Sequence, residues 1–280
     1  GLDFTFADLS DPAALDAHLR PETRLVWIET PTNPLLKVTD MEAMADIARQ
    51  HDLIFGVDST FATPALLRPL EYGADIVVHS LTKFINGTSD CIAGCICADD
   101  EFIHQLTDIN SGASMLLGPV LDSFRAASIL KNLHSLHIRI AKHSYNANYL
   151  AEKIEALGLK VYYPGLKSHV DNKLISELMN EGFGCGGMLA FDAGDEETAD
   201  NLMKKMQDEK VGYLAVSLGY FKTLFSSPGH STSSEIPKEE QKQMGLSEGL
   251  VRISVGLDNN IEKTFERIKK CLFDVGLLKS

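Results

Sequence analysis

Strand-like and helix-like segments alternate through the first hundred residues, and this alternation is the feature that most constrains the fold. Residues 25–29 and 53–58 form apolar runs typical of strands, and residues 41–51 between them place apolar side chains at helical spacing. Another strand pattern, residues 76–79, follows a short helical stretch that ends at Gly73. Strands that alternate with helices predict a parallel sheet whose strands are joined by crossover helices.

The second half of the chain has a different pattern. Residues 120–157 contain neither Pro nor Gly and have a continuous helical pattern, which suits a helix leaving one domain and a second helix opening the next. After Gly158, strand patterns alternate with helical ones, with strands at 160–163, 187–192, 214–216 and 250–255 and helices at 195–208 and 259–274. We therefore predict an α/β protein with a mostly parallel sheet in a large domain, residues 1–133, followed by a smaller α+β domain, residues 134–280.

The composition excludes several functional classes. A net charge of −13, without a long run of Lys and Arg, argues against a surface for nucleic acid or for an anionic membrane. The sequence has no apolar stretch of about 18 residues and no cleavable signal, so we expect no membrane segment.

Five cysteines are an odd number, and three of them cluster. Cys91, Cys95 and Cys97 lie in one strand-like apolar run, where alternation places all three on the same side. No histidine nearby completes a ligand set, so we predict free thiols in a reducing compartment, the cytoplasm, and no metal site. Isolated histidines are likewise expected to be packing or surface residues: His51, His79, His134 and His230.

A carboxylate and a lysine follow the ends of two strand patterns. Asp58 ends the run 53–58, and Ser80-Leu81-Thr82-Lys83 follows the run 76–79. A lysine amine can close an imine with an aldehyde, turn hydroxyls can hold a phosphate, and a carboxylate can keep a pyridine nitrogen protonated. The pattern therefore indicates a site for pyridoxal 5'-phosphate (PLP), although each residue taken alone is also typical of a solvated charge, a turn or a helix cap.

Further segments accompany these strand ends in a fixed order. They are Trp27-Ile28-Glu29-Thr30-Pro31-Thr32-Asn33-Pro34, Val216-Ser217-Leu218-Gly219 and Gly249-Leu250-Val251-Arg252-Ile253-Ser254-Val255-Gly256. The ordered set resembles the Cys/Met-metabolism family of PLP-dependent enzymes, over about residues 24–267. Four segments are most similar to the methionine γ-lyases of that family: Leu116-Leu117-Gly118-Pro119, Tyr163-Pro164-Gly165-Leu166, Ser217-Leu218-Gly219-Tyr220 and Ser231-Thr232-Ser233-Ser234-Glu235. The resemblance implies fold type I, with residues 1–133 belonging to the PLP-binding domain and residues 134–280 covering the substrate.

The resemblance implies a role for each residue at the two strand ends. Lys83 would carry the cofactor imine and, once a substrate amine has replaced it, act as the base at the α-carbon. Asp58 would pair with the protonated pyridine nitrogen. Ser80 and Thr82 would contact the phosphate.

Arg252 is the candidate for binding the substrate. It lies between Val251 and Ile253 in a strand pattern, so alternation points it to the opposite face, and a buried arginine needs an anion. In the resemblance, the matching arginine grips the substrate α-carboxylate. Asn33 would contact the cofactor ring and the carboxylate, and Ser217 would touch the same region.

Two departures from the family pattern are informative. The chain is expected to lack a long N-terminal segment that carries a glycine-rich phosphate loop, a ring-stacking tyrosine, and the Tyr and Arg that reach into a partner subunit. The third position after Ser217-Leu218-Gly219, commonly glutamate in relatives that process cystathionine, is Lys222. A cation there should repel a distal ammonium, which favours a substrate with an uncharged tail.

The resemblance implies a PLP-dependent carbon–sulfur lyase that γ-eliminates L-methionine to methanethiol, 2-oxobutanoate and ammonia. The alternatives are an O-acetylhomoserine sulfhydrylase, a cystathionine γ-synthase or γ-lyase on the same scaffold, or a non-catalytic homologue or fragment. A small sulfur amino acid is the expected substrate, and a homotetramer built as a dimer of dimers is the expected assembly.

Overall fold

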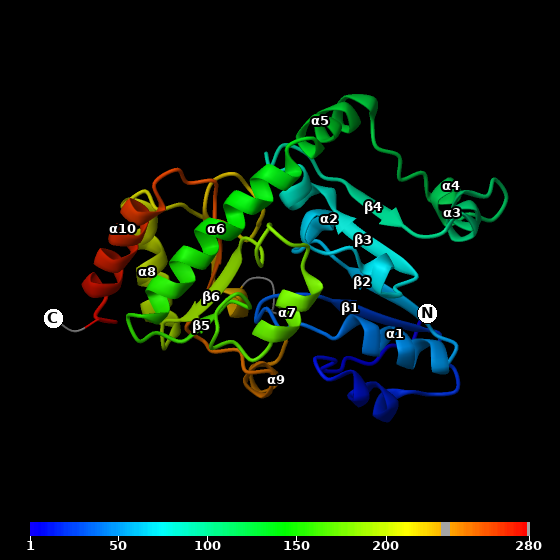
Figure 1. Ribbon diagram of the computed structural model, residues 1–280, viewed down its shortest axis with the longest axis horizontal. Coiled ribbons are helices and arrows are strands. Elements are labelled where there is room, and N and C mark those ends of the chain that lie inside the picture. The colour runs from blue at the N-terminus through cyan, green and yellow to red at the C-terminus, as the bar shows by residue number, and fades with distance from the viewer. Residues whose placement is uncertain (231–235, 279–280) are drawn as a thin grey trace.

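Two β-sheets organise the protein in the computed structural model, which describes residues 1–230 and 236–278 (Figure 1). The first sheet has the order β1-β2-β3-β4. Its first three strands are parallel, and α1 (Met41–Gln50) crosses from β1 to β2 with the Asp40 carboxylate capping its N-terminus. The strands are β1 (Leu25–Glu29), β2 (Ile54–Asp58), β3 (Ile76–Ser80) and β4 (Gly94–Cys97).

Strand β4 departs from the parallel pattern and from the predicted cysteine strand. It pairs antiparallel with β3 and begins at Gly94, so Cys91 lies before it and only Cys95 and Cys97 share a strand face. The prediction for Cys91 was wrong because the backbone N–H and C=O of Ala93 both bond to the Thr82 hydroxyl, at 2.9 and 3.2 Å. Pairing with β3 therefore starts at Gly94, one residue after Ala93.

Short helices connect and flank the first sheet. Gly73 ends one of them with a φ of 89°, the left-handed conformation predicted for a helix C-cap. Helices α3 and α4 follow β4 and project beyond its end, and α5 returns to pack against the turn that follows β3 (Figure 1). Besides the helical turn Leu81–Ile85, the helical segments of this half are 3-10 helices at Pro12–His18 and Pro69–Tyr72, α2 (Thr63–Leu66), α3 (Asp100–Thr107), α4 (Ala113–Leu117) and α5 (Ser123–Leu133).

The second sheet is mostly antiparallel, with the order β5-β6-β9-β8-β7. The long helix α6 (Leu136–Glu155) leads into this half and packs against α10 (Figure 1). Within the described residues, no helix has the length and apolar character needed to cross a bilayer. The elements are β5 (Val161–Tyr162), β6 (Met188–Asp192), α8 (Glu196–Asp208), β7 (Tyr213–Leu214), β8 (Leu224–Ser226), a 3-10 helix (Pro228–His230), α9 (Lys238–Gln243), β9 (Leu250–Ser254) and α10 (Ile261–Asp274).

Helix α7 (Asn172–Leu178) ties the two halves together. Its Ile175 and Leu178 are buried in the core of the first sheet, although α7 lies in the second half of the sequence. The N–H of Asn180, just beyond α7, donates to the carbonyl of Leu66 at 2.7 Å. The division into residues 1–133 and 134–280 stays a prediction, because the first core draws on both parts of the chain.

Candidate active site

Lys83 lies in a tight turn, Leu81–Ile85, that follows β3 directly. Its backbone leaves the helical conformation, with φ −87° and ψ −131°. The Lys83 ammonium Nζ donates to the hydroxyl of Ser217 at 3.1 Å. Burial, and then the positive charge of Arg252, lower the pKa of Lys83, so its amine loses a proton more readily than a solvated lysine.

Arg252 enters the same site from the middle of β9, with a side chain that is almost completely buried. Its flanking residues Val251 and Ile253 pack in the core of the second sheet, while the Arg252 guanidinium donates to Asn33 Oδ1 and to the carbonyl of Val216, both at 3.0 Å. Burial lowers the pKa of Arg252 to about 10. Both acceptors are uncharged, so the guanidinium keeps a positive charge that an anionic ligand would neutralise.

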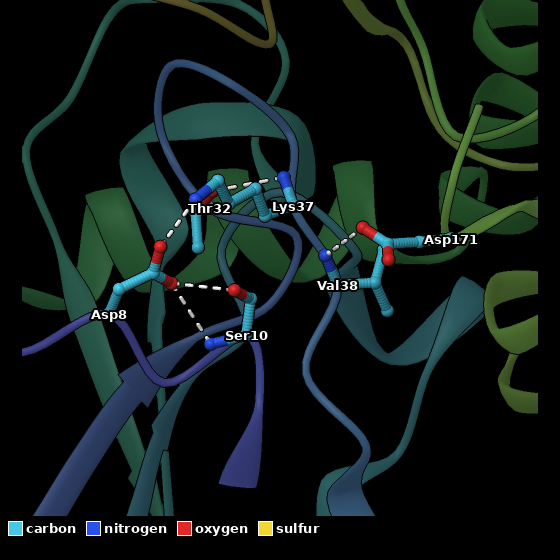
Figure 2. Close-up of polar contacts among 6 residues, drawn as sticks. All are labelled: Asp8, Ser10, Thr32, Lys37, Val38 and Asp171. Atoms are coloured by element: carbon cyan, nitrogen blue, oxygen red, sulfur yellow. Dashed lines mark hydrogen bonds and ion pairs between the residues drawn. The ribbon is translucent and has the colours of Figure 1, made fainter. Parts of the chain in front are cut away.

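Asn33, the partner of Arg252, lies in the loop from Thr32 to Val38. Hydrogen bonds between Thr32 and Lys37 close this loop on itself (Figure 2). The Thr32 N–H donates to the Lys37 carbonyl at 2.9 Å, and the Thr32 hydroxyl accepts the Lys37 N–H at 3.0 Å. At the end of the loop, the Val38 N–H donates to the Asp171 carboxylate at 3.0 Å. Asp171 precedes α7, so a residue of the second half holds the loop that carries Asn33.

A second carboxylate contacts this loop from the surface. Asp8 accepts the Lys37 ammonium at 2.5 Å and the Ser10 hydroxyl at 2.6 Å (Figure 2). The hydrogen bond from Lys37 lowers the pKa of Asp8 to about 2. The Asp8 side chain is 62% exposed, so solvent weakens this ion pair far more than it weakens the Asp171 contact.

Asp58 ends β2 beside the strand that leads to Lys83. It pairs in register with Val78 of β3, and its carboxylate accepts the N–H of Thr60 at 2.9 Å. The Thr60 hydroxyl in turn accepts the Ser80 N–H at 2.8 Å, which fixes the ends of β2 and β3 to each other. Thr60 was not predicted, and the only sequence signal for it is a hydroxyl two residues after a strand-end carboxylate.

Thr82, a predicted phosphate contact, already has a structural role in the turn. Its hydroxyl donates to the Ala93 carbonyl and accepts the Ala93 N–H. The contacts of Ser80 and Thr82 with a phosphate therefore stay predictions. Thr82 nonetheless lines the cleft described below, as does Ser217.

Two histidines pack close to these residues. His79 of β3 is buried, with Nδ1 3.0 Å from the Ser59 carbonyl, and burial lowers its pKa against the opposing effect of the Asp58 charge. His143 of α6 lies edge-on to the Phe84 ring, and burial lowers its pKa to about 4. Both are neutral near pH 7 and serve packing. Among residues 1–230 and 236–278, no three His, Cys, Asp or Glu side chains are grouped to hold a metal ion.

An open cleft of about 1020 Å³ lies against the Lys83 turn. Thr82 and Ser217 line it together with two aromatic side chains, Tyr213 and Tyr220. Its volume suits a ligand of cofactor size. Lys83, Asp58, Asn33 and Arg252 are not among the residues that line the cleft, but the Lys83 ammonium donates to Ser217 in its wall. The residues present fit PLP, because this lysine has a lowered pKa and lies near a buried arginine of unneutralised charge.

Comparisons with known proteins agree with this chemistry. The model of the Cys/Met metabolism PLP-dependent enzyme family matches residues 1–271. The chain is 38% identical over 268 residues to a methionine gamma-lyase of Arabidopsis thaliana, covering 95% of this chain and 60% of that protein. It is also 36% identical over 278 residues to a cystathionine gamma-lyase of Bacillus subtilis, covering 98% of this chain and 70% of the relative. A cystathionine beta-lyase of Lactococcus lactis is 37% identical over 277 residues, or 97% of this chain and 70% of the relative.

The matches confirm the predicted family, fold type and cofactor class. The chain spans 60 to 70% of the length of these three relatives. Of the segments that carried the resemblance, Ser231-Thr232-Ser233-Ser234-Glu235 lies outside the described residues. The names of these relatives refer to different sulfur amino acids. The comparisons therefore show the family of the chain but not its substrate.

Proposed function

Because the chain belongs to the Cys/Met metabolism family of PLP-dependent enzymes, we propose that the complete protein is a PLP-dependent carbon–sulfur lyase acting on L-methionine. The reaction consumes methionine and water and yields methanethiol, 2-oxobutanoate and ammonia. The observation that supports it most is the meeting of Lys83, Ser217, Asn33 and Arg252 in one site. It supports the proposal because Lys83 would serve as a base beside Arg252, which would bind a carboxylate.

Each residue has a distinct task in this proposal. When bound, PLP supplies an electron sink that stabilises negative charge at the substrate α-carbon. Lys83 takes the α-proton and returns a proton elsewhere, which its lowered pKa favours. Arg252 binds the α-carboxylate, with Asn33 orienting the guanidinium. Asp58 supplies the negative charge that keeps the ring nitrogen protonated.

Lys222 supports methionine rather than cystathionine as the substrate. Its ammonium lies 3.2 Å from the hydroxyl of Tyr213, and Tyr213 lines the cleft. A positive charge at the edge of the cleft disfavours the distal ammonium of cystathionine and leaves the uncharged thioether of methionine unaffected. Lys222→Glu should therefore raise activity on cystathionine relative to methionine.

The test is an assay of the purified full-length protein with three substrates. We expect 2-oxobutanoate and methanethiol from methionine alone, and little product from cystathionine. Homocysteine from O-acetylhomoserine plus sulfide, with no 2-oxobutanoate from methionine, would instead identify a sulfhydrylase. Efficient use of cystathionine would favour a cystathionine lyase, and the absence of an imine absorbance band after PLP addition would indicate a non-catalytic homologue.

The assembly and the cellular location belong to the same proposal. We expect a homotetramer built as a dimer of dimers, which analytical ultracentrifugation of the full-length protein would detect. We expect the enzyme in the cytoplasm, which fractionation of cells would test.

A further inference from the structure

Arg139 of α6, in the second half of the sequence, reaches the turn that carries Lys83 in the first half. Its Nη1 donates to the Phe84 carbonyl at 2.6 Å, and its Nη2 donates to the Ile85 carbonyl at 2.8 Å. The same guanidinium donates to the carbonyl of Asn132 at 3.0 Å and, through Nε, to the hydroxyl of Ser135 at 3.1 Å. One side chain thus joins the start of α6 to the two residues after Lys83.

Partial burial of the positively charged Arg139 guanidinium has a desolvation cost. Arg139 is half-buried, and burial lowers its pKa. All four of its acceptors are uncharged oxygens, so carbonyl and hydroxyl dipoles rather than a carboxylate stabilise the cation. Capping the C-terminus of α5 through Asn132 explains one of these bonds. The bonds to Phe84 and Ile85 need another explanation.

The backbone around the turn makes room for the guanidinium. Gly87 has a φ of 75°, and its N–H donates to the Lys83 carbonyl at 2.8 Å. A Cβ at Gly87 would lie 2.6 Å from Arg139 Nη1, closer than these atoms can approach. The glycine therefore permits both the chain reversal after Lys83 and the approach of Arg139.

A second contact holds the turn at Lys83 itself. A Cβ at Gly219 would lie 2.3 Å from the Phe84 nitrogen and 2.7 Å from the Lys83 carbonyl carbon, so the backbones pack directly against each other there. Gly219 follows Ser217, whose hydroxyl accepts the Lys83 ammonium. The peptide groups on the C-terminal side of Lys83 are therefore held by the Gly219 backbone and by the Arg139 guanidinium.

We propose that Arg139 is a positioning residue, which directs the Lys83 side chain toward the cleft by fixing the carbonyls of Phe84 and Ile85. This inference rests on the proposed function, in which the Lys83 amine condenses with the PLP aldehyde and releases water. Lys83 is not part of a regular helix at this point, so its direction depends on contacts that hold the following peptides. Arg139 supplies two of those contacts from α6.

The test measures the PLP linkage in full-length holoenzyme carrying Arg139→Met or Arg139→Lys. Arg139→Met removes the guanidinium with similar bulk, and Arg139→Lys keeps the charge but loses the planar fork. The matched control is Arg267→Met, because Arg267 of α10 is also partly buried and donates to a main-chain carbonyl, that of Lys210 at 3.4 Å. Borohydride reduction and peptide mapping give the fraction of bound PLP that is linked to Lys83.

We expect Arg139→Met to lower the linked fraction at least twofold and to lower kcat about 10- to 100-fold, with KM changed far less, because misplacement of a reacting group mainly affects the chemical step. Arg139→Lys should fall between Arg139→Met and the unsubstituted protein, and Arg267→Met should match the latter. Circular dichroism and Tm report whether each variant is folded; if Arg139→Met does not fold, Arg139→Lys alone decides.

A lower Tm with an unchanged linked fraction in the folded variants would overturn the inference and leave Arg139 a purely structural residue. Failure of the unsubstituted protein to link PLP at Lys83 would instead refute the proposed function. The two failures are therefore distinguishable.

Discussion

Lys83 and Arg252 meet in one site, yet the protein secures their positions in opposite ways. Arg252 lies in the middle of β9, paired in register with Ala190 of β6 on one side and Ser226 of β8 on the other. Lys83 lies in a turn with non-helical backbone angles, and a side chain, Arg139, holds the next two carbonyls. A sheet thus fixes Arg252, the residue proposed to bind the carboxylate, whereas contacts from distant segments fix Lys83, the residue proposed to exchange partners during the reaction.

Removal of the lysine amine should have the largest effect. Lys83→Ala should lower kcat by at least about 1000-fold, because neither the linkage to PLP nor the base remains, while non-covalent PLP binding persists. The measurement is turnover together with absorbance and total bound PLP. Lys263→Ala, on the exposed face of α10, is the control and should behave like the unsubstituted protein. Recovery of a borohydride-fixed pyridoxyl label on another lysine would show that Lys83 is not the attachment point.

The next prediction concerns Asp58, which ends β2 beside the strand that leads to Lys83. Asp58→Asn keeps the shape and the acceptor for the Thr60 N–H but removes the charge. We expect kcat to fall about 100-fold, as for loss of one electrostatic stabiliser of the transition state, with a smaller change in KM. Steady-state kinetics would separate the two. A change confined to KM would remove Asp58 from the cofactor role.

Arg252→Lys tests the residue of the site that the second sheet holds in place. The substitution keeps a charge but removes the planar fork, so we expect a loss of about 1–3 kcal/mol in binding, the usual worth of a charge-assisted hydrogen bond. The loss should be alike for methionine and O-acetylhomoserine, because the α-carboxylate is common to both, and the resting absorbance spectrum should change little. Substrate titrations would measure it. A loss restricted to one of the two substrates would show that Arg252 selects the tail.

The same contrast explains what the sequence could predict. Apolar runs predicted β1, β2, β3, β6 and β9 to within about two residues, although in β1 only Val26 and Ile28 are buried. Strand β8 has three residues, and α7 has seven and joins a core far away in sequence, so neither has a readable period. The neighbouring ends of β2 and β3 followed from parallel pairing, which placed Asp58 and Lys83 at one edge.

Periodic patterns in the sequence could not predict the contacts between residues far apart in the chain. Lys83 and Ser217 are 134 residues apart, and Asn33 and Arg252 are 219 apart, so only the family resemblance suggested that they share a site. Arg139 had no signal, because a charge at one position of a helix is ordinarily solvated. Its role depends on a turn that only the folded chain brings within reach.

The smallest expected effect concerns the loop that supports Arg252 through Asn33, and it compares two carboxylates that contact this loop from other segments. Asp171→Ala removes the acceptor of the Val38 N–H, so we expect a loss of about 1 kcal/mol in the free energy of unfolding and about a threefold rise in KM for methionine, with kcat nearly unchanged. Asp171→Asn retains an oxygen acceptor and should recover most of both. Denaturant unfolding and steady-state kinetics measure them.

Asp8→Ala is the matched control, since it removes a carboxylate from the exposed side of the same loop. Surface ion pairs contribute about 0–1 kcal/mol, so the change in unfolding free energy should be smaller than for Asp171→Ala, and KM should not change. The pKa of Asp8 is lowered from its ordinary value of 3.8 to about 2. Any stabilisation from this ion pair is therefore present at neutral pH and is lost as the pH falls from 3.8 toward about 2. Equal effects of the two substitutions on KM would show that the loop responds to its total charge, and that the Asp171 contact has no special part in orienting Asn33.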